Sequence, residues 1–113
     1  MNQITQHESR PQVVHPAVDV FENDDGLLVR ADLPGVTDQA LDIQLDNGLL
    51  TVVGTRTLPE FRGGGTVQYR RRFHVPKDVD GTQVTAHIDR GVLSIRLPKS
   101  EAARPRLIPI SRG

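Results

Sequence analysis

The sequence contains no cysteine and no tryptophan, and its 113 residues include only one tyrosine and three phenylalanines. The lack of cysteine excludes disulfides, zinc–thiolate sites and thiol catalysis. With so few aromatic residues, a hydrophobic core has to consist mainly of valine, leucine and isoleucine. No apolar run approaches the roughly 20 residues that cross a bilayer. The first 15 residues are polar and lack the apolar centre of a secretory signal, so we expect a cytoplasmic location.

An excess of charge of one sign is missing as well. The 14 lysines and arginines balance 14 aspartates and glutamates, which gives a formal net charge of zero. This balance provides no overall field that would attract nucleic acid or an anionic membrane, so neither is expected as a partner. The histidines are scattered and the serines lie in no strained-turn motif. We therefore predict no catalytic residue, no metal site, no cofactor and no enzymatic activity.

The sequence does contain short segments with the period-two alternation of β-strands. Leu41, Ile43 and Leu45 alternate with polar residues, and turn formers such as Asn47-Gly48 separate one segment from the next. Seven such segments in about eighty residues, with no sustained helical period, predict an all-β fold, a two-sheet antiparallel β-sandwich. The expected strands cover residues 17–22, 26–33, 41–45, 49–53, 67–75, 84–88 and 92–97, with a glycine-rich loop at 55–66.

The expected organisation has three parts. Residues 1–16 are polar, contain two prolines and are interpreted as a flexible N-terminal arm. Residues 17–98 form the β-sandwich domain. Residues 99–113 form a C-terminal tail that is polar except around Ile108-Pro109-Ile110.

Arg71 is unusual because it lies in the middle of an apolar row. Val67, Tyr69, Phe73 and Val75 share its face in an extended strand. A guanidinium group there is costly to bury unless a carboxylate or carbonyl group pairs with it. Two interpretations remain open: an edge position from which the side chain reaches solvent, and a buried or interfacial ion pair.

The tail is the second unusual feature. In an extended chain Ile108 and Ile110 project to the same side, and Pro109 between them disfavours a helix. Two exposed isoleucines at a polar chain end favour a surface that receives them. The tether from residue 98 to residue 107 can span roughly 30 Å, so this surface can belong to a second copy of the chain.

Several motifs together resemble the small heat-shock protein family, whose body is the α-crystallin domain. Leu33-Pro34-Gly35 resembles the family's stop after its second domain strand, and the run from Ala86 to Leu93 resembles its Ala-x-x-x-x-Gly-Val-Leu signature. Leu97-Pro98-Lys99 resembles the end of the domain, and Ile108-Pro109-Ile110 resembles the C-terminal Ile-x-Ile anchor. The resemblance extends over about residues 18–110.

The resemblance implies a dimeric building block, larger homo-oligomers and ATP-independent binding of unfolding client proteins. It implies that Ile108, Pro109 and Ile110 form the oligomer anchor, and that Arg71, with Tyr69 and Phe73, lies at a dimer interface. The groove that takes the anchor or a client would be lined by Leu41, Ile43, Leu45, Val84, Ala86 and Ile88, and which face of the 84–88 strand lines it is left open.

The chain departs from the family pattern in two places. Its N-terminal arm is short and has no phenylalanine, and its 55–66 loop contains a triple glycine, which is poor strand material. The dimer can therefore form by loop exchange or by pairing along the 67–75 strand. The leading function is a holdase chaperone, and the alternative is a β-sandwich co-chaperone-like adaptor that binds one folded partner.

Overall fold

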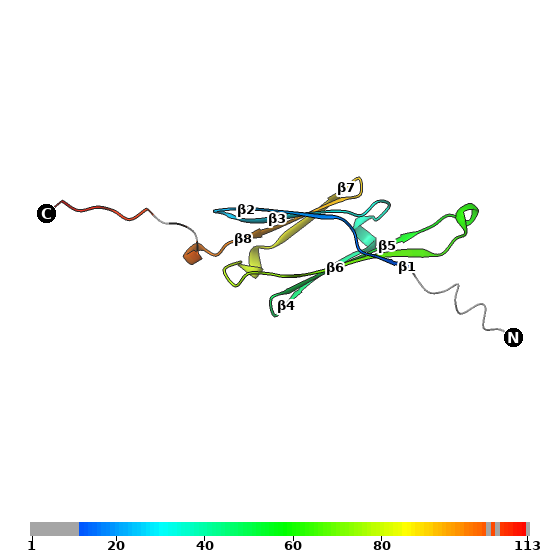
Figure 1. Ribbon diagram of the computed structural model, residues 1–113, viewed down its shortest axis with the longest axis horizontal. Helices are drawn as coiled ribbons and strands as arrows, with labels where there is room; N and C mark the ends of the chain where they lie inside the picture. The colour runs from blue at the N-terminus through cyan, green and yellow to red at the C-terminus, as the bar shows by residue number, and fades with distance from the viewer. Residues whose placement is uncertain (1–11, 104, 106, 113) are drawn as a thin grey trace.

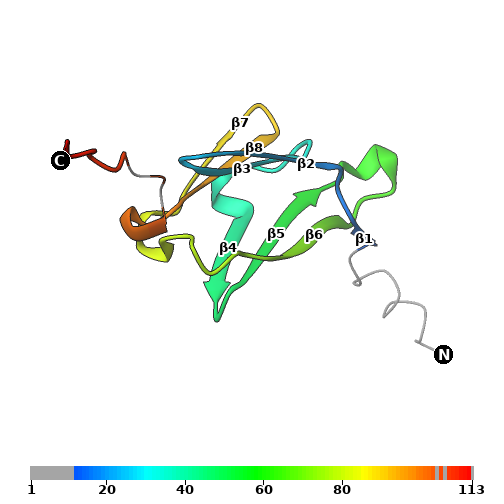
Figure 2. The same ribbon diagram turned by 60° about the vertical axis from the view of Figure 1, so that its left-hand side comes forward.

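The computed structural model describes residues 12–103, 105 and 107–112, which form two stacked four-stranded sheets (Figures 1 and 2). The strand order is β1-β6-β5-β4 in one sheet and β2-β3-β8-β7 in the other. This arrangement confirms the predicted all-β sandwich. The strands are β1 (Gln12–Val14), β2 (Val18–Asn23), β3 (Gly26–Asp32), β4 (Leu41–Asp46), β5 (Leu49–Thr57), β6 (Thr66–His74), β7 (Thr85–Asp89) and β8 (Val92–Pro98).

Three short turns of 3-10 helix occupy connections between strands, and a fourth follows β8. The first of them, η1, follows Thr37 and leads into β4. No helix in the described part of the chain has the length and apolar character needed to cross a membrane. The four turns are η1 (Asp38–Ala40), η2 (Glu60–Arg62), η3 (Gly81–Gln83) and η4 (Glu101–Ala103).

The core lies between the inner faces of the two sheets and follows the alternation in the sequence. Leu33, Leu93 and Ile95 are completely buried, and Leu50 and Val52 from the other sheet are almost as inaccessible. Aliphatic side chains dominate this core, as the shortage of aromatic residues requires. Burying each such side chain contributes about 1.5–3 kcal/mol relative to leaving it exposed.

The end of the expected flexible arm differs from the prediction. Residues 1–11 of that arm lie outside the described residues, but Gln12–Val14 form β1, which pairs in parallel with the start of β6. The contact links positions 55 residues apart in the sequence, such as Val14 and Tyr69. Two parallel strands far apart in the sequence are not joined by a short turn, so no turn residues indicate their pairing. The alternation over three residues is too short to predict β1 by itself.

The β5–β6 hairpin is longer than expected and extends beyond the sandwich (Figure 1). Residues 55–57, predicted to lie in a loop, continue β5, because Thr55 and Thr57 pair with Gln68 and Thr66. Threonine is β-branched and suits a strand. The connecting loop begins at Leu58, and its three glycines all have positive φ angles of 96°, 66° and 82°. Glycine is the residue that adopts this conformation without strain.

Replacing Leu93 with alanine should lower the free energy of unfolding by about 2–5 kcal/mol, because a cavity opens in the core. The side chain of Leu93 is 0% exposed, whereas Leu107 is 99% exposed, so Leu107→Ala is the matched control. The control should change stability by about 0.5 kcal/mol or less. Urea unfolding followed by circular dichroism, at equal chain concentrations, measures both. Equal losses in the two variants would contradict the position assigned to the core.

Candidate functional site

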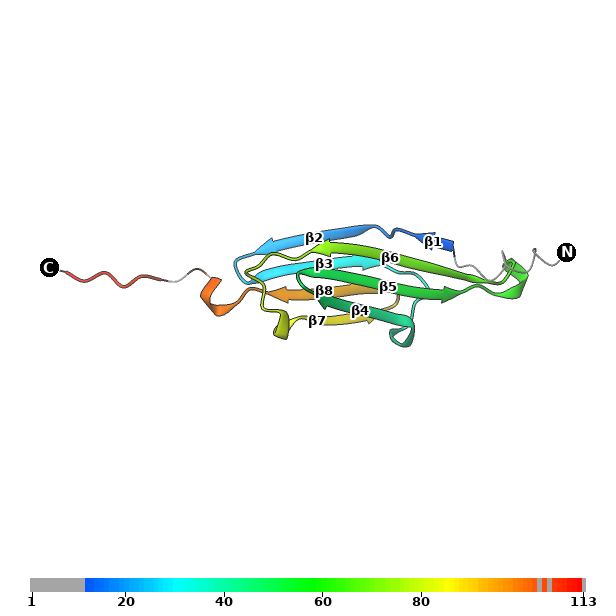
Figure 3. The same cartoon turned by 90° about the horizontal axis from the view of Figure 1, so that it is seen from below.

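The two long edges of the sandwich differ. On one edge the chain passes from β1 in the first sheet to β2 in the second, and on the opposite edge β4 and β7 each end their sheet with no further strand among the described residues (Figure 3). Nδ1 of His15 donates to the carbonyl oxygen of Arg70 at 3.0 Å, and the Asp32 N–H donates to the Ala17 carbonyl at 3.3 Å. These bonds attach the crossing segment to both sheets, so the β4–β7 edge is the open one.

Cross-strand register shows which side chains of β4 face the interior. Paired residues share a face of a sheet. Ile43 pairs with Val52 and Leu45 pairs with Leu50, and both of these partners are buried. The inner row of β4 therefore consists of Leu41, Ile43 and Leu45, which are half-buried at the open edge.

The same reasoning applies to β7, for which the sequence did not settle the inner face. Ala86 pairs with Ile95 and Ile88 pairs with Leu93, and both partners are fully buried. Ala86 and Ile88 therefore face the interior. Ile88 is half-buried, whereas Ala86 is exposed because it lies at the edge and its side chain is short.

The inner rows of β4 and β7 run in opposite directions along one groove, which we call the edge groove. At one end of it a surface hollow is lined by Leu41, Ala86 and Ile88. At the other end the turn η3 lies against β4, since a Cβ atom built on Gly81 would be 3.3 Å from the Leu45 side chain. The hollow thus brings together three of the six predicted groove residues. Ile43, Leu45 and Val84 are half-buried against the core instead.

The turn that leads into β7 is held by a carboxylate cap. Asp80 precedes η3, and its side chain accepts hydrogen bonds from the Thr82 N–H at 3.0 Å and the Thr82 hydroxyl at 2.6 Å. These two bonds lower the pKa of Asp80 below its ordinary value, because they favour the ionised form. The cap fixes the backbone directly before Val84 and the groove strand.

The predicted anchor is exposed in this chain. Ile108 and Ile110 are 81% and 92% exposed, and the tail leads away from the sandwich beyond η4 (Figure 1). The base of the tail is attached to the body, since the Lys99 N–H donates to the Asp25 carbonyl at 2.9 Å and the Lys99 ammonium lies 3.5 Å from Glu22. The chain's own edge groove and its own anchor are therefore apart.

The three predicted dimer residues have different environments. Tyr69 is only 8% exposed and belongs to the core of its own chain, where its hydroxyl donates to the Pro34 carbonyl at 3.5 Å. Phe73 is half-buried. Because β1 pairs only with Val67, Gln68 and Tyr69 of β6, the edge of β6 is free of β1 from Arg70 onward.

Arg71 lies on the inner face of its sheet, where this free edge begins. Its guanidinium donates to the Pro16 carbonyl at 3.4 Å and lies 5.4 Å from the ring centroid of Phe73. Among the described residues, the one ion pair joins Lys99 and Glu22, so Arg71 has no carboxylate partner there. Of the two interpretations of Arg71, the geometry within this chain matches the edge position.

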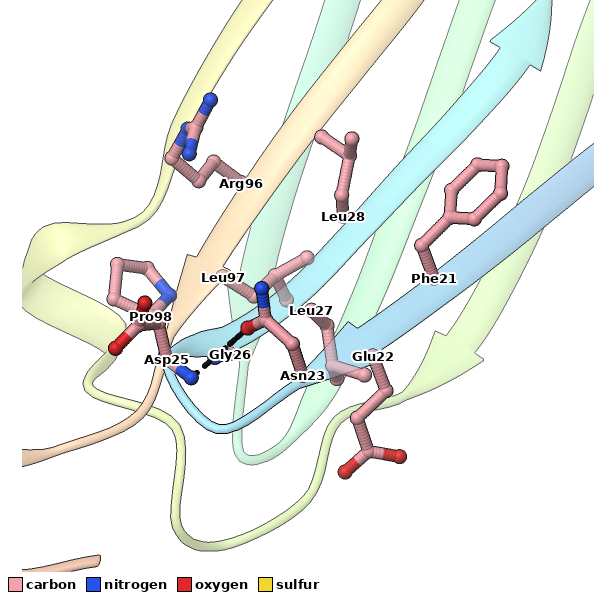
Figure 4. A pocket seen from close by; sticks show the side chains of 10 residues that line it. All are labelled: Phe21, Glu22, Asn23, Asp25, Gly26, Leu27, Leu28, Arg96, Leu97 and Pro98. Carbon is pink, nitrogen blue, oxygen red and sulfur yellow. Dashed lines mark hydrogen bonds between the residues drawn. The ribbon is translucent and has the colours of Figure 1, made fainter. Parts of the chain in front are cut away.

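Sequence analysis missed a second hollow, on the outer face of the β2-β3-β8-β7 sheet. Phe21 and Leu28 are cross-strand partners there, and Figure 4 shows them with Arg96 beside the β2–β3 turn. The Asn23 side chain accepts hydrogen bonds from the N–H groups of Asp25 and Gly26 and so holds this turn. The adjacent pair Leu27-Leu28 could have indicated this hollow. Of two consecutive residues in a strand one must face outward, so the pair predicts an apolar side chain on the outer face of the sheet.

Comparison with known proteins gives consistent matches. The Hsp20/alpha crystallin family model matches residues 19–111. Small heat shock protein C4 of Rickettsia felis is 29% identical over 108 residues, covering 88% of this chain and 66% of the relative. The 16.6 kDa heat shock protein of Oryza sativa subsp. japonica is 32% identical over 118 residues, covering 92% of this chain and 79% of the relative. The chain thus spans about two thirds to four fifths of these relatives' lengths.

Solved structures agree with the sequence matches. The crystal structure of a small heat-shock protein from Xylella fastidiosa, described as having a distinct high order structure, has a TM-score of 0.69 and 31% sequence identity. The match covers 88% of this chain and 98% of that one. The sandwich with an open β4–β7 edge, the family model and these relatives lead to one conclusion: the chain belongs to the Hsp20/alpha-crystallin family of small heat-shock proteins.

Proposed function

We propose that this protein is an ATP-independent holdase chaperone that binds unfolding proteins and prevents their aggregation. Membership of the small heat-shock protein family supports a chaperone role. The observation that carries the holdase proposal is the edge groove, whose apolar inner rows lie between two strands that lack an outer neighbour in the described part of the chain. An extended apolar segment of another protein fits such an edge, because it can bury side chains between the sheets and pair with the strand backbone.

The natural occupant of the groove at rest is the anchor of a second copy. Ile108 and Ile110 are exposed in their own chain, and two buried isoleucines contribute at most about 3–6 kcal/mol. Ordering the segment costs about 1–2 kcal/mol per residue, so a single docking event is weak and reversible. Many copies in one assembly hold together through effective concentration. Heating then releases anchors and raises the fraction of free grooves.

This mechanism requires no chemical reaction, so we propose neither catalytic residues nor a cofactor. Arg71 and Phe73, at the free edge of β6, are proposed to contact the second subunit of a dimer. Tyr69 supports that edge from within the core of its own chain. A cytoplasmic location is part of the proposal.

Changing Ile108 and Ile110 to serine should reduce the size of the assembly, because the anchor loses its apolar side chains. Leu107→Ser is the matched control, since Leu107 is as exposed as the isoleucines but projects to the opposite side of an extended tail. Native mass spectrometry and light scattering measure the size. An unchanged mass in the double variant would remove the anchor role. A monomeric wild-type chain would favour the adaptor function instead.

Filling the groove should have the same effect as removing the anchor. Ala86→Trp places a large side chain on the inner face of β7, where it competes with a docked segment. Thr85→Trp is the control, because Thr85 pairs with Arg96 on the opposite face of the same strand. Size-exclusion chromatography should show smaller particles for Ala86→Trp alone. Equal elution of both variants and the wild type would argue against docking at this edge.

The holdase activity is tested with an aggregation-prone client protein heated in the absence of ATP. The wild-type chain, at equal or higher subunit concentration, should suppress light scattering by the client. Ala86→Trp should suppress it less than Thr85→Trp does, because only the former fills the groove. No suppression by the wild-type chain at a several-fold excess would refute the holdase proposal.

A further inference from the structure

The edge groove is bordered by carboxylates at both ends. Asp38 and Asp89 line the hollow where Leu41 and Ile88 meet. Asp46 lies at the opposite end, directly after Leu45 in β4, and its pairing with Leu49 places its side chain on the outer face of the sheet at the strand end. All three are exposed, and none of them takes part in an ion pair among the described residues.

Basic side chains near the groove offset these charges only in part. His87 and Arg90 also line the hollow. Arg90 occupies the β7–β8 turn with a φ angle of 50°, and it is exposed. Apart from His87, the charged groups of the hollow are two carboxylates and one guanidinium, and Asp46 adds a third carboxylate at the far end. The groove surroundings are therefore acidic, although the whole chain has no net charge.

The tail sequence has the complementary pattern. In an extended chain, residues two apart project to the same side. The row that contains Ile108 and Ile110 continues with Arg106 before them and Arg112 after them. If the docked tail is extended, the side that presents the two isoleucines also presents an arginine at each end.

The lengths of the two patterns agree. Arg106 and Arg112 are six positions apart in the sequence, which is roughly 20 Å of extended chain. From Leu41, beside Asp38, to Asp46 the strand rises roughly 17 Å over five residues. The two lengths differ by less than the reach of an arginine side chain. The arginine at each end of the tail row can therefore reach a carboxylate while both isoleucines lie over the inner rows of β4 and β7.

We propose that the carboxylates at the two ends of the edge groove select an aliphatic pair flanked by arginines, so that Arg106 and Arg112 of a second copy's tail pair with Asp46 and with Asp38 or Asp89. This inference rests on the proposed docking of the tail and adds the chemical class of segment that the groove prefers. Client segments of the same class, an apolar pair between basic residues, compete best with the tail. Charge pairing at a partly exposed rim adds selectivity to the apolar contact.

The test uses the full chain carrying Ile108→Ser and Ile110→Ser, so that its own tails leave the groove free, and a dye-labelled peptide of residues 103–113. Fluorescence anisotropy measures the Kd of three peptides: wild type, Arg106→Gln with Arg112→Gln, and Ile108→Ser with Ile110→Ser. The arginine-free peptide should bind about 3- to 10-fold more weakly than the wild-type peptide at low salt. The difference should shrink at 0.5 M salt, because salt screens exposed charges.

The receptor is changed in parallel. Asp38→Asn, Asp46→Asn and Asp89→Asn together should weaken the wild-type peptide by a similar factor and leave the arginine-free peptide unaffected, as expected for a coupled pair. The control receptor carries Asp19→Asn, Asp24→Asn and Asp25→Asn, which change the net charge equally at the opposite side of the sandwich. This control should bind the wild-type peptide as before.

The possible failures are distinguishable. If the wild-type and arginine-free peptides bind equally and more tightly than the serine peptide, the selection by charge is wrong and tail docking stands. The same conclusion follows if the control receptor loses as much affinity as the groove receptor, because only overall charge then matters. If the serine peptide binds as well as the wild type, or no peptide binds, tail docking fails and the charge proposal fails with it.

Discussion

The two sheets bury apolar rows against each other, and these rows continue onto strands that have only one neighbour in their own sheet. In the middle of the sandwich each row is covered by the opposite sheet, which makes Leu93 and Ile95 inaccessible. At the β4–β7 edge the same alternation leaves Ile43 and Ile88 half-buried, and within the described residues the strand backbones are unpaired on one side. The groove is therefore a direct continuation of the core, and the apolar burial that folds the chain would also stabilise a segment docked in it, as proposed.

At the opposite edge of the sandwich, the chain itself covers part of the exposed strand edges. The segment between β1 and β2 is bonded to Arg70 on one sheet and to Asp32 on the other. Arg71 also places a charge in the apolar row of β6 where β1 has ended, and a charge at an edge discourages unspecific strand pairing. One edge is thus closed by the chain and has a charge in its apolar row beyond the crossing, whereas the inner rows of the other edge are apolar and its charged residues border them.

The sequence was sufficient for the fold and for the inner row of β4, because both depend on local alternation. The inner residues of β3, β4 and β8 could be read from period two, and turn residues such as Asn47-Gly48 indicated where strands end. The inner face of β7 required the register with β8, since Ala86 and His87 are equally plausible in isolation. The parallel β1 could not be predicted, because its partner lies 55 residues away and three residues carry too little pattern. The environment of Arg71 depended on that same contact, since the position of Pro16 follows from where β1 ends.

The separation of the tail from its own groove has a geometric consequence. In the proposed docking, every copy carries one donor segment and one acceptor surface at different places on the molecule, so a contact between them would be heterologous: each subunit would donate in one direction and accept from another. A two-fold dimer contact uses the same patch on both partners and saturates after one event, whereas a donor–acceptor contact always leaves a free donor and a free acceptor until the chain of subunits returns to its start. With the base of the tail attached to the β2–β3 turn at Asp25, the rotation from one subunit to the next decides whether such a series closes into a ring or shell or continues to grow as a filament.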